Sequence, residues 1–341
     1  MGSITIKDVA TDAGVSTATV SHVINRTRYV SQEMTDRVNS SIMKLKYYPN
    51  LLVGSLRSKK SNTIGIVIPS ISNETFGALA EGIQKTFFNL NYNIILCNTS
   101  YDTELEEKAL NTMIMKQADA IILISVADYS NKMKEIQEMG IPVILVDRMY
   151  PGVSIDMVRI NNFKGEYDVV KYLIDRGHRR IGYVDRKLEQ SHSREQRNGY
   201  IEALKDRDIP FDPKIVVRAE GHDFNAGVEV AKRLMKLAPD ITAVAAYYDI
   251  VAVGVMRGLM DLGYSIPDDI SVVGFDGMKV TEVTYPRLTT VLTPIDTMVE
   301  KVCEVVVKRL EEKSKDSEAI KSFEPVDIVI ESELIVRESS K

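Results

Sequence analysis

The sequence predicts a small all-α head followed by a larger α/β body whose sheets are parallel. Short amphipathic helices separated by turns occupy the first 48 residues. From residue 64 onward, short apolar strands alternate with amphipathic helices, which is typical of a parallel sheet covered on both faces. A chain of 341 residues is also too long for one ordinary hydrophobic core, so two or three domains are expected.

The composition is that of a globular protein, with 44% hydrophobic and 27% charged residues. No apolar run approaches the roughly 18 residues that a membrane span needs, and the first residues lack the apolar core of a secretory signal. The two cysteines, Cys97 and Cys303, lie far apart in the sequence and predict no disulfide framework. We therefore expect a cytoplasmic protein.

Charge is divided unevenly between the head and the body. Residues 1–60 contain nine Lys or Arg and four acidic residues, a net charge of +5, although the whole chain carries −5. A basic head on an acidic body indicates a polyanionic partner for the head. A basic surface that is only exposed to solvent would have the same charge, so charge alone does not establish a polyanionic partner. The helix pattern distinguishes the two interpretations.

The head begins with two predicted helices separated by a glycine turn. Thr5 can cap a helix over 6–13, Gly14 can end it in the left-handed conformation, and Ser16 can cap a second helix over 17–25. This order is typical of a helix-turn-helix, and the short polar side chains of the second helix permit close approach to a DNA major groove. A protein-binding helical subdomain is the weaker alternative. The DNA contacts expected here come from Thr5, Ser16, Thr17, Ala18, Thr19, Ser21, His22, Asn25 and Tyr29.

A third helix and a hinge are predicted to complete the head. Ser31 can cap the third helix, Pro49 stops it, and Asn50 can cap a short fourth one. The leucines that follow are too apolar for a free linker and are succeeded by basic residues, as a minor-groove wedge requires. Packing against a second subunit is a compatible alternative. The hinge residues expected at DNA are Asn50, Val53, Gly54, Leu56 and Arg57.

The body is predicted to contain two similar series of strands and helices. The expected strands are 64–68, 93–97, 118–124, 143–146, 181–184, 214–217, 241–246 and 270–274, with a strand-rich end at 326–336. The expected helices are 75–91, 103–116, 129–139, 163–176, 193–207, 223–237, 250–262 and 295–312. Two such series suggest two lobes with a ligand cleft at the carboxyl ends of the strands.

Several motifs belong together as a set. They are IKDVA from Ile6, AGVS from Ala13, ATVS from Ala18, VIN from Val23, YPN from Tyr48, SLRSKK from Ser55 and TIGIVIP from Thr63. This set resembles the lactose-repressor/galactose-repressor (LacI/GalR) family of transcription regulators, over essentially the whole chain. The resemblance implies a body of two doubly wound parallel-sheet lobes like those of periplasmic binding proteins, joined by three crossovers.

The resemblance also implies domain boundaries and DNA contacts. The boundaries are 1–48 for the helix-turn-helix, 49–61 for the hinge helix and linker, 62–161 with 291–323 for the N-terminal lobe, 162–290 with 324–338 for the C-terminal lobe, and 339–341 for a tail. Thr17, Ala18 and His22 match residues that face base edges, and Leu56 matches one that wedges between base pairs. His22 stands where Arg is usual, which implies a different half-site. Gly54 costs a hinge helix about 1 kcal/mol, so that helix should form only on DNA.

An effector site between the lobes is implied as well. Asp276 ends a strand, where its carboxylate can accept two sugar hydroxyls. The family's usual arginine is Gln196 here, flanked by Arg194 and Arg197, of which Arg197 could replace it. Tyr248 stands in place of a usual Asn and would either close the pocket or stack on a ring. The remaining residues that match effector positions are Asn73, Phe76, Asp147, Arg148 and Phe224.

No motif for catalysis is found in the sequence. There is no phosphate-binding Gly loop followed by Lys, no dinucleotide motif, no G-x-S-x-G and no metal-ligand spacing of histidines. We therefore expect no enzyme, no cofactor and no metal. The expected protein is a repressor of a carbohydrate-catabolic operon, associated with the nucleoid when bound to DNA. It would be a homodimer or tetramer on a palindromic operator, with a sugar or sugar phosphate as effector. The alternatives are control by a phosphorylated carrier protein, a solute-binding protein, or a sugar-acting enzyme.

Overall fold

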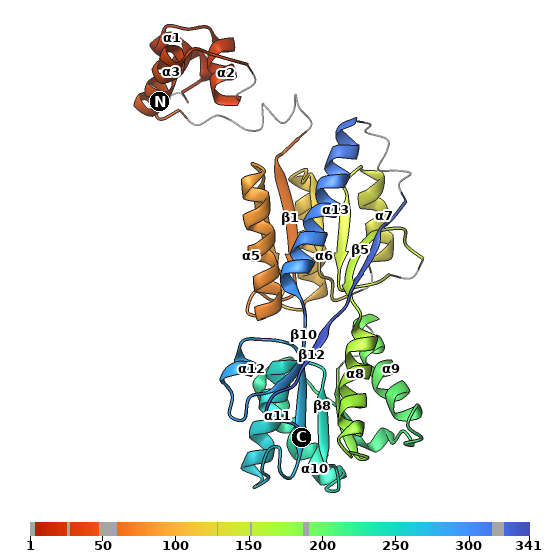
Figure 1. Cartoon of the computed structure of the whole chain (residues 1–341). Coiled ribbons are helices and arrows are strands. Elements are labelled where there is room, and N and C mark those ends of the chain that lie inside the picture. Colours follow the sequence, from red (N-terminus) through yellow and green to blue (C-terminus); the bar gives the residue numbers. More distant parts are fainter. Residues whose placement is uncertain are drawn as a thin grey trace. The chain divides into compact units, whose positions relative to one another are not determined.

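The computed structural model describes residues 4–25, 28–47, 60–127, 129–150, 152–186, 191–315 and 324–341. The chain divides into two compact units, 1–61 and 62–341, and each is described by itself (Figure 1). The predicted hinge residues Asn50, Val53, Gly54, Leu56 and Arg57 lie outside the described residues, as does the hinge helix.

The first unit is a three-helix head built from α1 (Ile6–Ala13), α2 (Thr17–Asn25) and α3 (Gln32–Leu45). Its core is centred on Val9, Val20 and Val38, one from each helix, all fully buried. Helix α1 begins with a capping box between Thr5 and Asp8. The turn to α2 passes through Gly14 at φ 62°, a left-handed conformation that glycine adopts without steric cost. The predicted helix-turn-helix is confirmed.

The second unit begins with a lobe built on a six-stranded parallel sheet in the order β11-β5-β4-β3-β1-β2. Its strands are β1 (Thr63–Ile68), β2 (Asn93–Asn98), β3 (Ala120–Leu123), β4 (Val143–Val146), β5 (Asp156–Ile160) and β11 (Asp327–Ile330). Helices α5 (Glu74–Asn89) and α13 (Ile295–Lys315) lie side by side and cover one face, as Figure 1 shows. Helices α6 (Thr103–Met115) and α7 (Ser130–Glu138) contribute to the core on the other face.

The other lobe repeats this plan with the order β12-β10-β9-β8-β6-β7, and only its edge strand β12 pairs antiparallel in this sheet as described. Its strands are β6 (Ile181–Asp185), β7 (Val216–Arg218), β8 (Ala243–Ala246), β9 (Ser271–Asp276), β10 (Thr289–Leu292) and β12 (Glu333–Ile335). Helices α8 (Asn162–Asp175) and α9 (Ser191–Lys205) pack on one face, and α10 (Phe224–Leu237) and α11 (Asp249–Asp261) pack on the other. Two short helices, η1 (Pro213–Ile215) and α12 (Val280–Val283), lie in connections.

The sheets correct three of the predicted lobe boundaries. Strand β11 pairs with β5, so residues 327–330 belong to the first lobe and the third crossover follows Ile330. Strand β10 spans the predicted boundary at 290/291 and lies wholly in the second sheet. The predicted tail is also part of the second lobe: Ser339 is fully buried and donates to the Val272 carbonyl at 2.6 Å. Backbone pairing at the sheet edges therefore sets these limits.

Candidate effector cleft and DNA-binding surface

The head presents small polar side chains at the start of its second helix. Ser16, Thr17 and Ala18 are exposed, and the Ser16 hydroxyl accepts from the Thr19 amide at 3.1 Å and so caps α2. Tyr29, after the helix, is 94% exposed. Short exposed residues at the N-terminal end of a second helix are the arrangement by which such helices reach base edges in a major groove. Of the other predicted contacts, Thr5 is exposed, Ser21 and His22 are half-buried, and only the backbone of Asn25 is described.

A cavity lies between the two lobes of the body, beside the carboxyl ends of strands from both sheets. Seven of the ten predicted effector residues line it: Asn73, Phe76, Asp147, Arg148, Gln196, Tyr248 and Asp276. The polar or aromatic lining residues that the sequence did not reveal are Thr75, Tyr101, Asn162, Arg186, His192, His222 and Thr293. Its volume is about 50 Å³, against about 300–1,000 Å³ for typical ligand pockets. In this arrangement the two lobes lie close together around a small cavity.

Three predicted effector residues do not line this cavity. Arg194 is exposed, and Phe224 is 37% exposed at the start of α10. Arg197 does not replace the family arginine, because its guanidinium lies 3.3 Å from the Asp185 carboxylate. These residues are corrections to the predicted site.

Asp276 ends β9 in an unusual conformation, with φ at 109°. Positive φ is uncommon for a residue with a side chain and is found mostly where the surrounding structure imposes it. Burial raises the pKa of its carboxyl group to about 7, while the guanidinium of Arg186 acts in the opposite direction. The carboxyl group therefore lines the cleft as a hydrogen-bonding group that is partly ionised at neutral pH.

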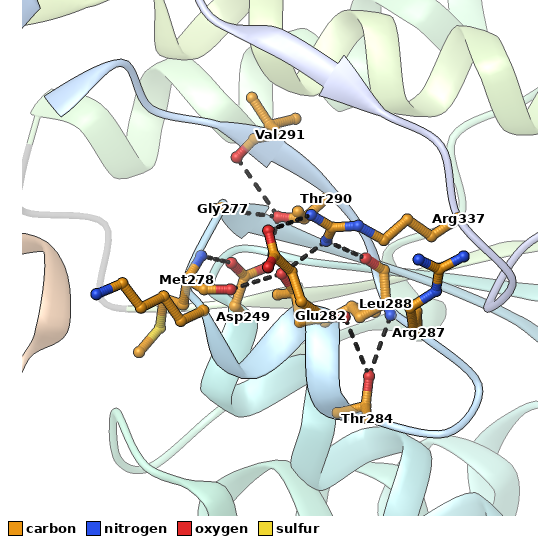
Figure 2. Close-up of polar contacts among 12 residues, drawn as sticks. Asp249, Gly277, Met278, Glu282, Thr284, Arg287, Leu288, Thr290, Val291 and Arg337 are labelled. Atoms are coloured by element: carbon orange, nitrogen blue, oxygen red, sulfur yellow. Dashed lines mark hydrogen bonds and ion pairs between the residues drawn. The ribbon is translucent and has the colours of Figure 1, made fainter. Parts of the chain in front are cut away.

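Asp249 fixes the chain just after Asp276. Its carboxylate accepts from the Met278 amide at 2.7 Å and from the Thr290 hydroxyl at 2.6 Å, and Figure 2 shows these contacts from the start of α11. The Thr290 hydroxyl in turn accepts from the Gly277 amide at 3.3 Å. Asp249 is fully buried, and burial raises the pKa of its carboxyl group well above the usual value. Asp249 and Thr290 therefore fix the backbone of Gly277 and Met278, directly after Asp276.

Arg148 and Asp147 form the corresponding end of β4 in the first lobe. The Arg148 side chain donates to the carbonyls of Ser125 and Asp147, each at 2.6 Å, and is buried. Asn162 donates to the Asp147 carboxylate at 2.9 Å. Burial lowers the pKa of Arg148, and Asp147 opposes this effect. These two hydrogen bonds fix the orientation of the Arg148 guanidinium.

Contacts between the lobes hold the cleft closed. The Tyr101 ring stacks on the His222 imidazole, and the Glu74 carboxylate oxygens each accept from the Lys279 amide at 3.2 Å. The Met149 amide donates to a serine hydroxyl at the start of α9 at 3.0 Å. These contacts join segments of the two lobes that adjoin Asn73, Asp147 and Asp276.

Comparison with known proteins finds a matching family model for the head and another for the body. Residues 5–50 match the model described as bacterial regulatory proteins, lacI family, and residues 61–328 match periplasmic binding proteins and sugar binding domain of LacI family. Catabolite control protein A of Priestia megaterium is 32% identical over 320 residues, which cover 93% of this chain and 96% of that protein. The ribose operon repressor of Escherichia coli K12 is 32% identical over 308 residues, 90% of this chain and 93% of its own. A solved complex of the transcriptional regulator CelR with cellobiose has a TM-score of 0.73 at 26% identity and covers 99% of this chain and 100% of that one.

The head and the cleft together define a DNA-binding transcription regulator with an effector-binding body. Its relatives are transcriptional regulators. The chain belongs to the lacI family of bacterial regulatory proteins. In the described part of the chain, no helix is long and apolar enough to cross a membrane, and no group of three or more His, Cys, Asp or Glu side chains is arranged to hold a metal ion.

Proposed function

We propose that this protein is a cytoplasmic repressor of a carbohydrate-catabolic operon, acting as a homodimer on a palindromic operator without a catalytic step. The observation that carries the proposal is the cleft between the lobes, which Asp276 lines together with aromatic rings and fixed donors. A carboxylate that accepts hydroxyls beside aromatic faces is suited to a sugar. The relatives named after catabolite control and ribose support this class of effector.

The coupling between cleft and operator rests on lobe closure. An effector can change DNA affinity only by as much as its own affinity differs between two arrangements of the protein. The cavity is small and contacts join the two lobes around it, so an effector that binds one arrangement of the lobes more tightly than another would shift the balance between them. In a homodimer, such a change would alter the spacing of the two heads and hence their fit to two half-sites.

The operator is tested first, with the full chain. Random duplex DNA retained by the purified protein is sequenced, and the recovered consensus is expected to be a short palindrome. Binding to that duplex is then measured while candidate sugars are titrated. A single asymmetric half-site bound at full affinity would contradict the palindromic operator. Operator binding that no sugar changes would contradict the sugar effector.

A further inference from the structure

A guanidinium group lies in the cleft although the family's arginine position holds Gln196. It belongs to Arg186, directly after β6, whose Nη2 donates to the Gln196 side-chain oxygen at 3.1 Å. The same guanidinium lies over the Tyr247 ring, 4.8 Å from its centroid, and the Gln196 amide donates to the Tyr247 carbonyl at 3.4 Å. Gln196 and Tyr247 therefore fix a cation that comes from a different element.

Three buried polar atoms at this end of the cleft have no partner among the described residues. They are Nε of Arg186 and both ring nitrogens of His192, whose side chain is 2% exposed. Burying such groups unpaired costs about 1–3 kcal/mol each, so a site that keeps them is expected to pair them with a ligand or with water. Both residues line the cavity.

The protonation states of His192 and His222, which both line the cavity, determine which of their ring nitrogens donate and which accept hydrogen bonds. Burial lowers the pKa of His192 well below its usual value and that of His222 to about 4, and the nearby arginines act in the same direction. A neutral His192 has one donor and one acceptor nitrogen. The Tyr247 hydroxyl donates to the Gly221 carbonyl at 3.0 Å, so it accepts from Nδ1–H of His222 at 2.9 Å. Nε2 of His222 is then a bare acceptor.

The cavity lining contains equal numbers of arginine and aspartate side chains, and their charges balance when Asp276 is ionised. Among the described residues, the lining contains two arginines, Arg148 and Arg186, and two aspartates, Asp147 and Asp276. A phosphate or carboxylate would add negative charge beside the two aspartates in a buried space, where like charges repel strongly. Hydroxyl groups, which donate and accept at once, match a lining that combines Arg186 donors, histidine acceptors and the Asp276 carboxylate.

We propose that Arg186, fixed by Gln196 and the Tyr247 ring, is the specificity-determining cation of the cleft. With His192, His222 and Asp276 it selects an uncharged polyhydroxyl ligand over a phosphorylated or acidic sugar. The inference rests on the proposed effector function and narrows it. Arg186 supplies the guanidinium that the family resemblance places on α9. The residue that determines the ligand class is therefore one that the spacing of residues in the sequence does not predict.

The ligand class is tested by calorimetric titration of the full chain with matched probes. They are glucose, glucose 6-phosphate and glucuronate; ribose and ribose 5-phosphate; and cellobiose. We expect binding of at least one neutral sugar, and affinity at least about tenfold weaker for its charged counterpart, because a desolvated like charge costs more than one pKa unit of interaction. The inference would be overturned if a charged probe bound more tightly than its neutral parent. It would also be overturned if none of the six probes bound.

The role of Arg186 is tested with the sugar that binds most tightly. Arg186→Gln is expected to weaken its binding about tenfold to hundredfold through loss of a charge-assisted hydrogen bond. The double variant Arg186→Gln with Gln196→Arg restores a guanidinium from α9 and should recover part of that loss. Arg194→Gln removes an exposed arginine on the same helix and should bind like the parent. Unchanged affinity in folded Arg186→Gln, judged by circular dichroism, would remove Arg186 from the site.

Operator binding separates this inference from the proposed function. The Arg186→Gln protein should bind the selected operator as the parent does, because the substitution lies in the body. If sugars alter operator binding but the sugar affinities of the Arg186 variants and of the charged probes differ from those expected, the proposed function stands. Only the role of Arg186 in selecting an uncharged ligand is then contradicted. If no small molecule alters operator binding by the parent, the proposed effector control is lost as well.

Discussion

The Tyr101 ring of the first lobe stacks on the His222 imidazole of the second, with centroids 4.9 Å apart and planes 22° apart. Both side chains line the cavity, and Nδ1 of His222 is hydrogen-bonded to the Tyr247 hydroxyl. The stack therefore joins a side chain near the end of β2 to the residues before α10. These contacts between the lobes therefore oppose opening of the cleft.

Tyr101→Ala should speed release of the effector. An aromatic pair contributes about 0.5–1.5 kcal/mol beyond its buried area, so the dissociation rate should rise about twofold to tenfold. Stopped-flow displacement of the tightest-binding sugar measures this rate. Tyr101→Phe keeps the ring and is the matched control, while Tyr285→Ala removes a ring that is 95% exposed. An unchanged dissociation rate in Tyr101→Ala would show that the stack does not restrain the lobes.

Leu56→Ala should lose specific operator binding while folding and dimerisation remain. Leu56 lies outside the described residues, so this expectation comes from the sequence: unstacking a base step costs a few kcal/mol that a bent, wedged complex must offset. We expect at least about a tenfold loss of operator affinity in fluorescence anisotropy. Leu237→Ala, which removes a leucine of the body that is 59% exposed, is the control. Equal affinities for parent and Leu56→Ala would mean that Leu56 only packs against protein.

Stability should fall as pH rises above about 5, because buried carboxyl groups resist ionisation in the folded protein. Burial raises the pKa of Glu166 from 4.5 to about 8, with Asp185 acting in the same direction, and that of Asp276 to about 7. A raised carboxyl pKa means that the folded state holds the proton more tightly, so unfolding becomes easier between the unfolded and folded pKa values.

Glu166→Gln removes one of these titrations. The decline of the unfolding free energy with pH should become shallower by at most about 1.4 kcal/mol per pH unit between about pH 5 and pH 7. Urea unfolding at several pH values measures the slope. Glu229→Gln, at an exposed position, should leave the slope unchanged. A parent protein whose stability rises over this interval would contradict the sign of the argument.

The sequence predicts the parts of the cleft that follow regular strands. Asp147 directly follows an apolar strand and Asp276 is the last residue of another. Because ligand sites in parallel sheets form at the carboxyl ends of the strands, their convergence follows from topology. The sequence pattern does not predict strand β5, because Asp156 and Arg159 interrupt its apolar residues. Asp156 is fully buried, and its carboxylate accepts from Arg309 on α13, at 2.7 and 2.8 Å, and from the Val326 amide at 3.0 Å. A partner so far along the chain is invisible to local periodicity.

The remaining cleft residues depend on contacts between elements. Arg186 replaces a guanidinium expected on α9, and Tyr101 meets His222 only because the lobes close. Arg197 is one residue from the expected position, yet the Asp185 carboxylate holds it elsewhere. Sequence spacing along one helix gives no information about a competing carboxylate at the end of a neighbouring strand, which is why that prediction differs from the structure.

Asp276→Asn should abolish the effector response and spare operator binding. The amide keeps the shape of the side chain but loses charge-assisted acceptance of hydroxyls, about 1.5–3 kcal/mol, or about a tenfold to hundredfold loss of sugar affinity. Asp249 should still hold the following loop, because its contacts go to the Met278 amide and the Thr290 hydroxyl. Operator binding by the parent and the variant is compared with and without the tightest-binding sugar. Asp268→Asn, at an exposed aspartate of the same lobe, is the control. Equal sugar responses in the Asp276→Asn variant and the parent would place the effector away from this carboxylate, whereas loss of operator binding without sugar would show that Asp276 also determines the DNA-binding arrangement.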